Sequence, residues 1–171
     1  IIDYRSEGAY ELSLPGEFNA DNARAAAAAV RAIYPEVSES TIAESLKGFA
    51  GTWRRFEYKG KPKRGADVYD DYAQHPTAIA KTLAELRKKT SGKIYVAFHP
   101  HLYSRTRDLF EGFAQAFTDA DRVLIAPIYA AREVDDGTVS NTTLAEAIAK
   151  NGREAKPADF GEILRYFETE P

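Results

Sequence analysis

The order of elements in this sequence predicts an α/β fold built on a mostly parallel sheet. Residues 93–98 and 122–128 are apolar stretches with the length of buried strands. Each is followed by a segment with helical spacing of its apolar residues, at 106–117 and 142–149. Strands that alternate with helices are typical of a parallel sheet that carries helices on both faces.

The first part of the chain is expected to be mainly helical. A short strand, an alanine-rich helix and a second helix are placed at residues 10–14, 23–32 and 38–48. The alanine run has very high helix propensity, and Asn19 or Asp21 is the expected cap of that helix. Ser38 is expected to cap the second helix, which would end at Gly48. We therefore expect a domain boundary between residues 48 and 49.

The second part, residues 49–171, is expected to form one Rossmann-like domain of three layers. Its strands are predicted at residues 53–58, 66–69, 93–98 and 122–128, and its helices at 76–89, 106–117 and 142–149. Residues 59–65 form a basic turn that contains glycine and proline. Strand, helix, strand, helix and strand in succession indicate right-handed crossovers between parallel strands.

Composition limits the classes of function. Lys and Arg number 23 against 26 Asp and Glu, and the net charge of -3 gives no general attraction to nucleic acid or to anionic lipid. The sequence has no apolar stretch of the roughly 20 residues that a membrane span requires. Without cysteine it has no disulfide or thiolate site, so the redox compartment cannot be read from it. Because nothing in the sequence suggests secretion, we expect a cytoplasmic protein. It also lacks methionine, from which we expect it to be a fragment.

Polar and aromatic residues follow three of the predicted strands directly. These segments, at residues 70–76, 99–106 and 129–133, contain all three histidines of the chain. Ligands of open parallel sheets bind outside the carboxyl ends of the strands, where loops and helix N-termini meet. The sequence therefore predicts a site at that edge.

Simpler interpretations exist for the residues in these segments. Asp70 and Asp71 precede a helix, where carboxylates favour the helix dipole and the cap. His99 and His101 could be half of a metal site completed by His75 and Asp71, but two histidines around a proline lack a demanding ligand geometry. We expect no metal site.

Two groups of basic residues precede the first of these segments. Arg54 and Arg55 are most simply the solvated edge of a strand. The basic cluster at residues 59–64 is most simply a solvated loop, because an acidic chain is a poor candidate for nucleic-acid binding. Position alone assigns neither group a function.

Five segments, in order along nearly the whole chain, resemble motifs of the Mur ligases. They are LPGEFNADN at 14–22, FAGTWRRFE at 49–57, DDYAQHP at 70–76, FHPHLYSRT at 98–106 and IYAARE at 128–133. Within the family they are most similar to the branch that joins L-alanine to UDP-N-acetylmuramate. Each segment alone is weak evidence, but five in order are highly specific.

The resemblance implies an ATP-dependent ligase in which ATP phosphorylates a carboxylate and an amine attacks the acyl phosphate. By resemblance, Asn19 and Asn22 would hydrogen-bond the adenine, because an amide both donates and accepts. Asp71 would accept from the ribose hydroxyls, and Arg55 would contact the phosphates, whose developing charge a guanidinium offsets. His101 and Arg105 would hold the amino-acid or muramoyl side of the reaction.

Three residues depart from the family pattern. Phe18 and Gln74 stand where the family has His, and His99 stands where it has Gln. The chain also has no GxxxxGK[ST] phosphate loop and no domain for the UDP sugar. We therefore expect residues 1–48 to be the tail of the central ATPase domain and 49–171 to be the C-terminal domain. ATP and Mg²⁺ are the expected cofactors, and Mg²⁺ would be bound mainly by the central domain. Without the other domains of the same enzyme, the chain should be inactive.

Two alternatives stay open. A sibling ligase that attaches a recycled tripeptide to UDP-N-acetylmuramate shares the DDxxHHP pattern, but the segment 100–106 resembles the alanine-adding branch. The other alternative is a non-catalytic nucleotide-binding module that kept the fold.

Overall fold

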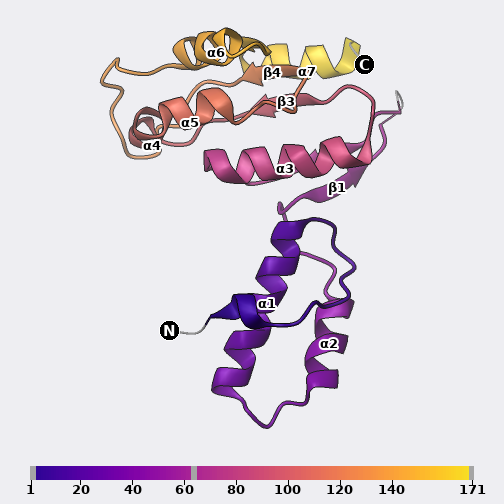
Figure 1. The fold of residues 1–171 in the computed structure, drawn as a ribbon. Helices are drawn as coiled ribbons and strands as arrows, with labels where there is room; N and C mark the ends of the chain where they lie inside the picture. Colours follow the sequence, from indigo (N-terminus) through magenta and orange to yellow (C-terminus); the bar gives the residue numbers. More distant parts are fainter. Residues whose placement is uncertain (1–2, 63–64, 170–171) are drawn as a thin grey trace. The chain divides into compact units, whose positions relative to one another are not determined.

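The computed structural model describes residues 3–62 and 65–169 and divides into two units, Ile1–Glu57 and Tyr58–Pro171 (Figure 1). We call them unit 1 and unit 2 and describe each by itself. The expected boundary after residue 48 lies within unit 1, at the end of its last helix. The assignment of residues 1–48 to a central ATPase domain stays a prediction.

Unit 1 contains a 3-10 turn and two helices. Their bounds are Tyr4–Ser6 (η1), Glu17–Ile33 (α1) and Glu39–Gly48 (α2). The prediction for α2 is confirmed, because Ser38 Oγ accepts from the Thr41 N–H at 3.2 Å and the helix ends at residue 48. Unit 1 is thus a pair of helices with short connections.

The start of α1 differs from the prediction. The helix begins at Glu17 after Gly16, whose φ of 106° is a conformation that glycine adopts at little cost. Neither Asn19 nor Asp21 is the cap: Asn19 Nδ2 donates to the Pro15 carbonyl at 2.7 Å, and Asp21 pairs with an arginine one turn on. The glycine turn therefore starts the helix earlier than the alanine run indicates.

The strand predicted at residues 10–14 is wrong. The segment has no regular structure, because no second strand lies beside it to supply backbone hydrogen bonds in the described part of unit 1. Side chains hold it instead. The Tyr10 hydroxyl accepts from Arg31 at 2.8 Å, and Glu11 pairs with Lys47 at 2.9 Å.

Unit 2 contains a parallel sheet in the order β3-β4-β5 and a separate two-stranded sheet, β1-β2. The strands are Glu57–Gly60 (β1), Val68–Asp70 (β2), Tyr95–Phe98 (β3), Arg122–Ile125 (β4) and Glu154–Pro157 (β5). The helices are Pro76–Lys89 (α3), Tyr103–Asp108 (α4), Phe110–Gln115 (α5), Asn141–Lys150 (α6) and Phe160–Thr169 (α7). Both neighbours of β4 run parallel to it, so the α/β class with a parallel sheet is confirmed.

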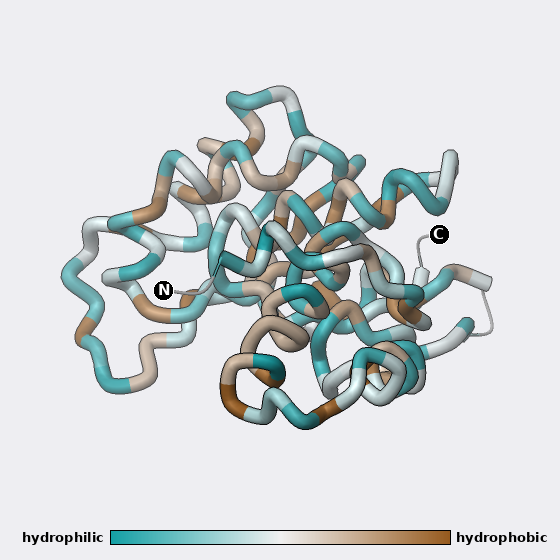
Figure 2. The backbone as a smooth tube through the Cα atoms, turned by 60° about the horizontal axis from the view of Figure 1, so that its bottom comes forward, coloured by the Kyte–Doolittle hydropathy of each residue, from teal (hydrophilic) through white to brown (hydrophobic). Residues whose placement is uncertain are grey.

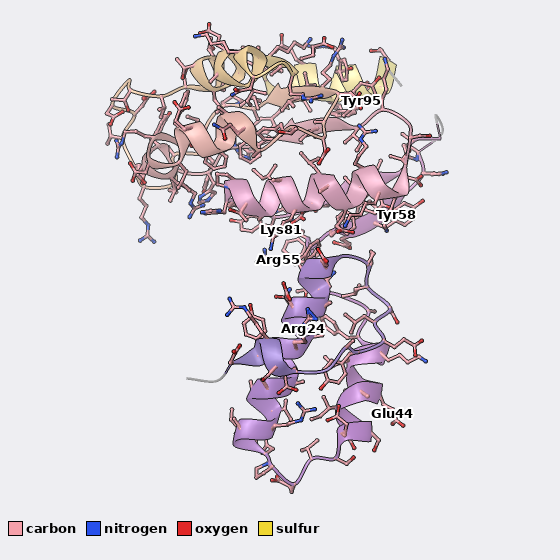
Figure 3. All side chains as sticks on the ribbon, viewed as in Figure 1. Arg24, Glu44, Arg55, Tyr58, Lys81 and Tyr95 are labelled. Atoms are coloured by element: carbon pink, nitrogen blue, oxygen red, sulfur yellow. The ribbon has the colours of Figure 1, made fainter. Side chains whose placement is uncertain are left out.

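The central strand β4 shows how both faces are covered. Val123 and Ile125 are fully buried on one face, in a cluster with side chains of α3, α5 and α6. Leu124 points to the other face and packs with Tyr166 of α7. Tyr95 of β3, labelled in Figure 3, joins that second cluster through a ring contact of 6.0 Å with Tyr166. Helices therefore lie on both faces, as the pattern predicts.

Three elements of unit 2 correct the sequence prediction. β2 pairs with β1 and not with the parallel sheet, and it is a three-residue strand whose Val68 is exposed. The helix expected over 106–117 is broken at Leu109, which leaves the helical conformation between α4 and α5. The strand expected over 122–128 ends at Ile125, shortly before Pro127, which has no N–H for a ladder.

Helices α3 and α5 approach each other closely at one point. A side chain at Gly112 of α5 would place its Cβ 3.0 Å from Cγ of Pro76, the first residue of α3. Glycine avoids that tight contact, and proline is well suited to the first turn of a helix. The contact ties the beginning of α3 to α5.

Hydropathy follows this arrangement. In Figure 2 the tube changes repeatedly between brown, hydrophobic residues and teal, hydrophilic ones along the helices. This change along one element gives each helix an apolar side for the core. In the described part of the chain, none of the helices combines the length and the apolarity that a bilayer span needs.

Candidate functional site

The carboxyl ends of β3 and β4 bring two of the three predicted segments together. The Leu102 N–H donates to the Tyr129 carbonyl at 2.8 Å, and the Tyr129 N–H donates to the Pro100 carbonyl at 2.8 Å. His101 and Tyr129 form an isolated parallel bridge beyond the strands. The segments 99–106 and 129–133 are therefore continuous with the sheet and lie side by side at its edge.

The two histidines after β3 differ in their surroundings. His99 contacts the rings of Tyr129 and Phe160 edge-on, with centroids at 5.9 and 5.1 Å. Burial lowers the pKa of His99 below its ordinary value, and the charge of His101 lowers it further. His101 lies 4.9 Å from the Tyr129 ring, and its Nδ1 is buried without a hydrogen-bond partner among the described residues. A buried ring nitrogen with no protein partner is available to a ligand or to water.

Arg105 lies in the first turns of α4 and is half-buried. Within residues 3–62 and 65–169 its guanidinium has neither an ion pair nor a hydrogen bond. Because a partly buried arginine normally has a partner, this guanidinium is a candidate for an anionic group such as a carboxylate. Leu102, just before α4, has a φ of 76°, which is strained for a residue with a side chain.

The third predicted segment leads from β2 into α3. Asp71 Oδ2 accepts from the Thr82 hydroxyl of α3 at 2.7 Å. The idea that Asp70 or Asp71 caps the helix is wrong, because the cap is His75, whose Nδ1 accepts from the Thr77 N–H at 3.2 Å. Thr82 was not among the predicted residues, and a single threonine within a helix gives no local signal for this contact.

Gln74 stands where the Mur ligase motif that this segment resembles has a histidine. Its Oε1 is buried without a hydrogen-bond partner in the described part of the chain. Among the described residues no group of three or more His, Asp or Glu could hold a metal ion.

The remaining predicted residues belong to unit 1. Asn19 and Asn22 are one helical turn apart on α1, so they share a face. The Asn19 side chain donates to the Pro15 carbonyl, whereas the side chain of the exposed Asn22 makes no hydrogen bond to any residue that the structure describes. The Phe18 ring, at the position where the motif that this segment resembles has a histidine, packs edge-on against Phe56 at 6.3 Å.

Arg55 lies in a turn before β1 and not in a strand, which corrects the prediction for residues 53–56 (Figure 3). Its side chain is exposed. The residues on either side, Arg54 and Phe56, have φ angles of 54° and 51°, so the turn is strained. Arg54 stacks over Trp53 at 5.6 Å and its N–H donates to Glu57, which leaves Arg55 as the exposed cation of the pair.

Comparison with known proteins agrees with this arrangement. Residues 54–169 match the family model described as Mur ligase, glutamate ligase domain. The chain is 46% identical over 160 residues to the UDP-N-acetylmuramate–L-alanine ligase of Clostridium acetobutylicum, and this match spans 93% of the chain and 34% of that protein. It is 43% identical over 167 residues to the ligase of the same name from Lachnospira eligens, with 97% and 36% covered. It thus spans about a third of the length of these relatives.

Solved structures show the same likeness. The UDP-N-acetylmuramate–alanine ligase of Thermotoga maritima matches with a TM-score of 0.67 at 26% identity, over 94% of this chain and 33% of that one. The murein peptide ligase of Psychrobacter arcticus matches with a TM-score of 0.63 at 27% identity, over 94% and 33%. The family model covers most of the chain, and relatives above 40% identity cover nearly all of it. The chain therefore belongs to the Mur ligase family.

Proposed function

We propose that this chain is the C-terminal part of a cytoplasmic ligase that joins L-alanine to UDP-N-acetylmuramate in peptidoglycan precursor synthesis. The observation that carries the proposal is 46% identity over 93% of the chain to a ligase of that name. In the proposed reaction ATP phosphorylates the muramoyl carboxylate. The amine of L-alanine then attacks the acyl carbon, the amide bond forms and phosphate leaves.

The nucleotide would be bound by four residues of this chain. Asn19 and Asn22 would hydrogen-bond the adenine, and the exposed Arg55 would approach the phosphates. Asp71 would accept from the ribose hydroxyls in an orientation set by its 2.7 Å bond to Thr82. Magnesium would be held mainly by parts of the enzyme outside this chain.

The amino-acid or muramoyl side would be held by His101 and Arg105. Support comes from the two unpaired polar groups described above, the buried Nδ1 of His101 and the half-buried guanidinium of Arg105. A guanidinium can bind a carboxylate through two hydrogen bonds, which would orient L-alanine for attack.

The sibling activity, attachment of a tripeptide, is the second candidate. The TM-scores of 0.67 and 0.63 to the two kinds of ligase are too similar to choose between them. The segment 100–106 and the names of the curated relatives favour L-alanine. Phosphate release by the full-length enzyme with UDP-N-acetylmuramate and ATP would decide. L-alanine should support turnover and the tripeptide should not, and the reverse result would overturn the proposal.

The residue assignments can be tested in the same full-length enzyme. Arg55→Ala should lower kcat by about 100-fold, comparable to the loss of one preorganised electrostatic donor. Asp71→Ala should mainly raise KM for ATP, because a ribose contact is similar in the ground and transition states. Arg24→Ala is the matched control, since Arg24 already pairs with Asp21 within α1. Near-wild-type kinetics for both site variants, with unchanged melting temperatures, would contradict the nucleotide assignment.

A further inference from the structure

The loop after β4 contacts the short helix α4 through three acidic side chains. Glu133, Asp135 and Asp136 form what we call the acidic loop, residues 133–136. Asp136 pairs with Arg107 at 2.8 Å. Burial raises the pKa of the Tyr103 hydroxyl above its ordinary value, and the nearby charge of Asp135 raises it further. Glu133 differs from the other two because it accepts a hydrogen bond from a backbone N–H in the first turn of α4.

Glu133 supplies the N-terminal cap that α4 otherwise lacks. Leu102, the residue at the cap position, provides no side-chain hydrogen bond to the helix. Instead, Glu133 Oε2 accepts from the Ser104 N–H at 2.9 Å, and Oε1 accepts from the Ser104 hydroxyl. These bonds lower the pKa of Glu133 below its ordinary value, with the hydroxyl contributing most. A carboxylate that binds the first N–H groups of a helix also interacts favourably with its dipole.

The backbone that Glu133 holds is strained. Leu102 has a φ of 76°, and in the facing segment Ala131 has a φ of 52°. The Leu102 carbonyl accepts from the buried Thr106 hydroxyl at 2.8 Å. Strained residues persist only where surrounding contacts over-determine them, and the Glu133 bonds are among those contacts.

His101 and Arg105 lie immediately before and within this capped turn. Neither the Nδ1 of His101 nor the guanidinium of Arg105 has a hydrogen-bond partner among the described residues. Their orientation therefore depends on the backbone between them, at Leu102 to Ser104, and, for His101, also on the ring contact with Tyr129 at 4.9 Å. Two residues of the facing segment hold that backbone: the Tyr129 carbonyl accepts from the Leu102 N–H at 2.8 Å, and Glu133 accepts from the Ser104 N–H at 2.9 Å.

We infer that Glu133 is a positioning residue for the ligation reaction. By capping α4 it holds His101 and Arg105 in the arrangement that the amino-acid substrate requires. The inference rests on the function proposed above. A catalytic arrangement that moves by about 1 Å loses on the order of 100-fold in rate, so loss of this cap should have a measurable kinetic effect.

The kinetic test uses the full-length ligase. Glu133→Ala should lower kcat/KM for L-alanine by about 10- to 100-fold and leave KM for ATP within about twofold. Glu133→Gln should recover most of the loss, because its amide oxygen still accepts from the Ser104 N–H. The matched control is Asp136→Ala, which removes a carboxylate of the same loop from an exposed ion pair and should change kcat/KM less than about twofold. Equal changes in kcat/KM for L-alanine in Glu133→Ala and Asp136→Ala would overturn the inference. So would a Glu133→Ala variant whose KM for ATP changes by as large a factor as its kcat/KM for L-alanine.

A second measurement separates this inference from the proposed function. In NMR spectra of the 171-residue chain, Glu133→Ala should shift the Ser104 amide and His101 ring signals, whereas Asp136→Ala should not. Ser104→Ala removes only the hydroxyl bond and should shift the amide signal of residue 104 and the His101 ring signals by less. This variant replaces Glu133→Ala in the test if Glu133→Ala does not fold. Unchanged signals in both the Glu133 and Ser104 variants would refute the cap. Wild-type enzyme that does not use L-alanine would refute the proposed function and leave the cap standing.

Discussion

The two units of this chain bury side chains of different size. The core of unit 2 contains fully buried Phe113, Phe117 and Leu144. In unit 1 the buried residues of α1 are all alanines, α2 contributes only Ile42, and Phe56 is the one large ring buried among the described residues. Each alanine removes little apolar area from water, so unit 1 gains less from burial for each ordered residue than unit 2 does.

Ion pairs and side-chain hydrogen bonds join the segments of unit 1. Arg31 of α1 pairs with both Glu7 and Glu39 and donates to Tyr10, so one guanidinium joins three segments. Ser13 donates to the Lys47 carbonyl at 2.6 Å. The difference teaches that a strong helix-forming sequence does not by itself create a strong core.

The largest expected effect is in the core of unit 2. Phe117→Ala should lower the free energy of unfolding by about 3–5 kcal/mol, because it removes a buried ring and leaves a cavity. The matched control is Phe160→Ala, the same change at a ring that is 59% exposed, and should cost below about 1 kcal/mol. Urea unfolding of both variants by circular dichroism would measure this. Similar losses for the two would show that unit 2 does not depend on its core in this way.

A smaller effect is expected in unit 1. Ile42→Ala should destabilise α1 and α2 by about 2 kcal/mol, at the low end for such a change, because it removes the one buried side chain of α2 in a unit whose other buried helix residues are alanines. Hydrogen exchange of peptides from the two helices would report this, with peptides from unit 2 as reference. Ile33→Ala, at a residue 66% exposed in α1, is the control and should leave exchange nearly unchanged. If Ile42→Ala costs as much as Phe117→Ala, the contrast between the units is wrong.

The smallest effect concerns a polar link in unit 2. Asp121 accepts from the Ile94 N–H and from Arg87, each at 2.7 Å, and these bonds lower its pKa. A folded-state pKa below the unfolded value means that the carboxylate stabilises the protein above the unfolded pKa, about 3.9, and loses this effect as pH falls through the folded value. Asp121→Asn should therefore cost about 1 kcal/mol at pH 7 and less at pH 3.

Asp119→Asn is the control for that variant. Only the backbone carbonyl of Asp119 bonds to Arg87, and the substitution preserves it. Chemical denaturation of both variants between pH 3 and pH 7 would measure the difference. A cost for Asp121→Asn that does not change with pH would contradict the assignment of the stabilisation to the carboxylate.

Local patterns in the sequence predict the elements in which several independent signals agree. Helix α3 matches its predicted bounds, because a proline at its start, one apolar face and a basic end all agree. Strand β5 and helix α7 were not predicted. In β5 only Ala155 is partly buried and the strand ends at a proline, so neither an apolar run nor an alternation marks it. It is a strand because β4 lies beside it.

The candidate site also has a part that the sequence predicts and a part that it does not. Its position after β3 and β4 follows from the rule for parallel sheets, and the structure brings those two segments together. The bonds from Thr82 to Asp71 and from Ser104 to Glu133 could not be predicted, because they join residues far apart in the sequence. The prediction that β2 lies in the same sheet failed because partner choice between short strands depends on tertiary packing. The ligand roles stay predictions.

The contact between Gly112 and Pro76 has a consequence for protein engineering. Pro76 ends the segment that contains Asp71 and begins α3, and Gly112 of α5 sets how closely that beginning can approach. The spacing at this point thus depends on a pair of residues outside the loops that bear the candidate ligand groups. A chimera that exchanges the 70–76 loop with that of a relative should keep its geometry only when the partner of Pro76 remains a glycine. A graft in this family should therefore exchange the 70–76 loop together with the contacting helices α3 and α5.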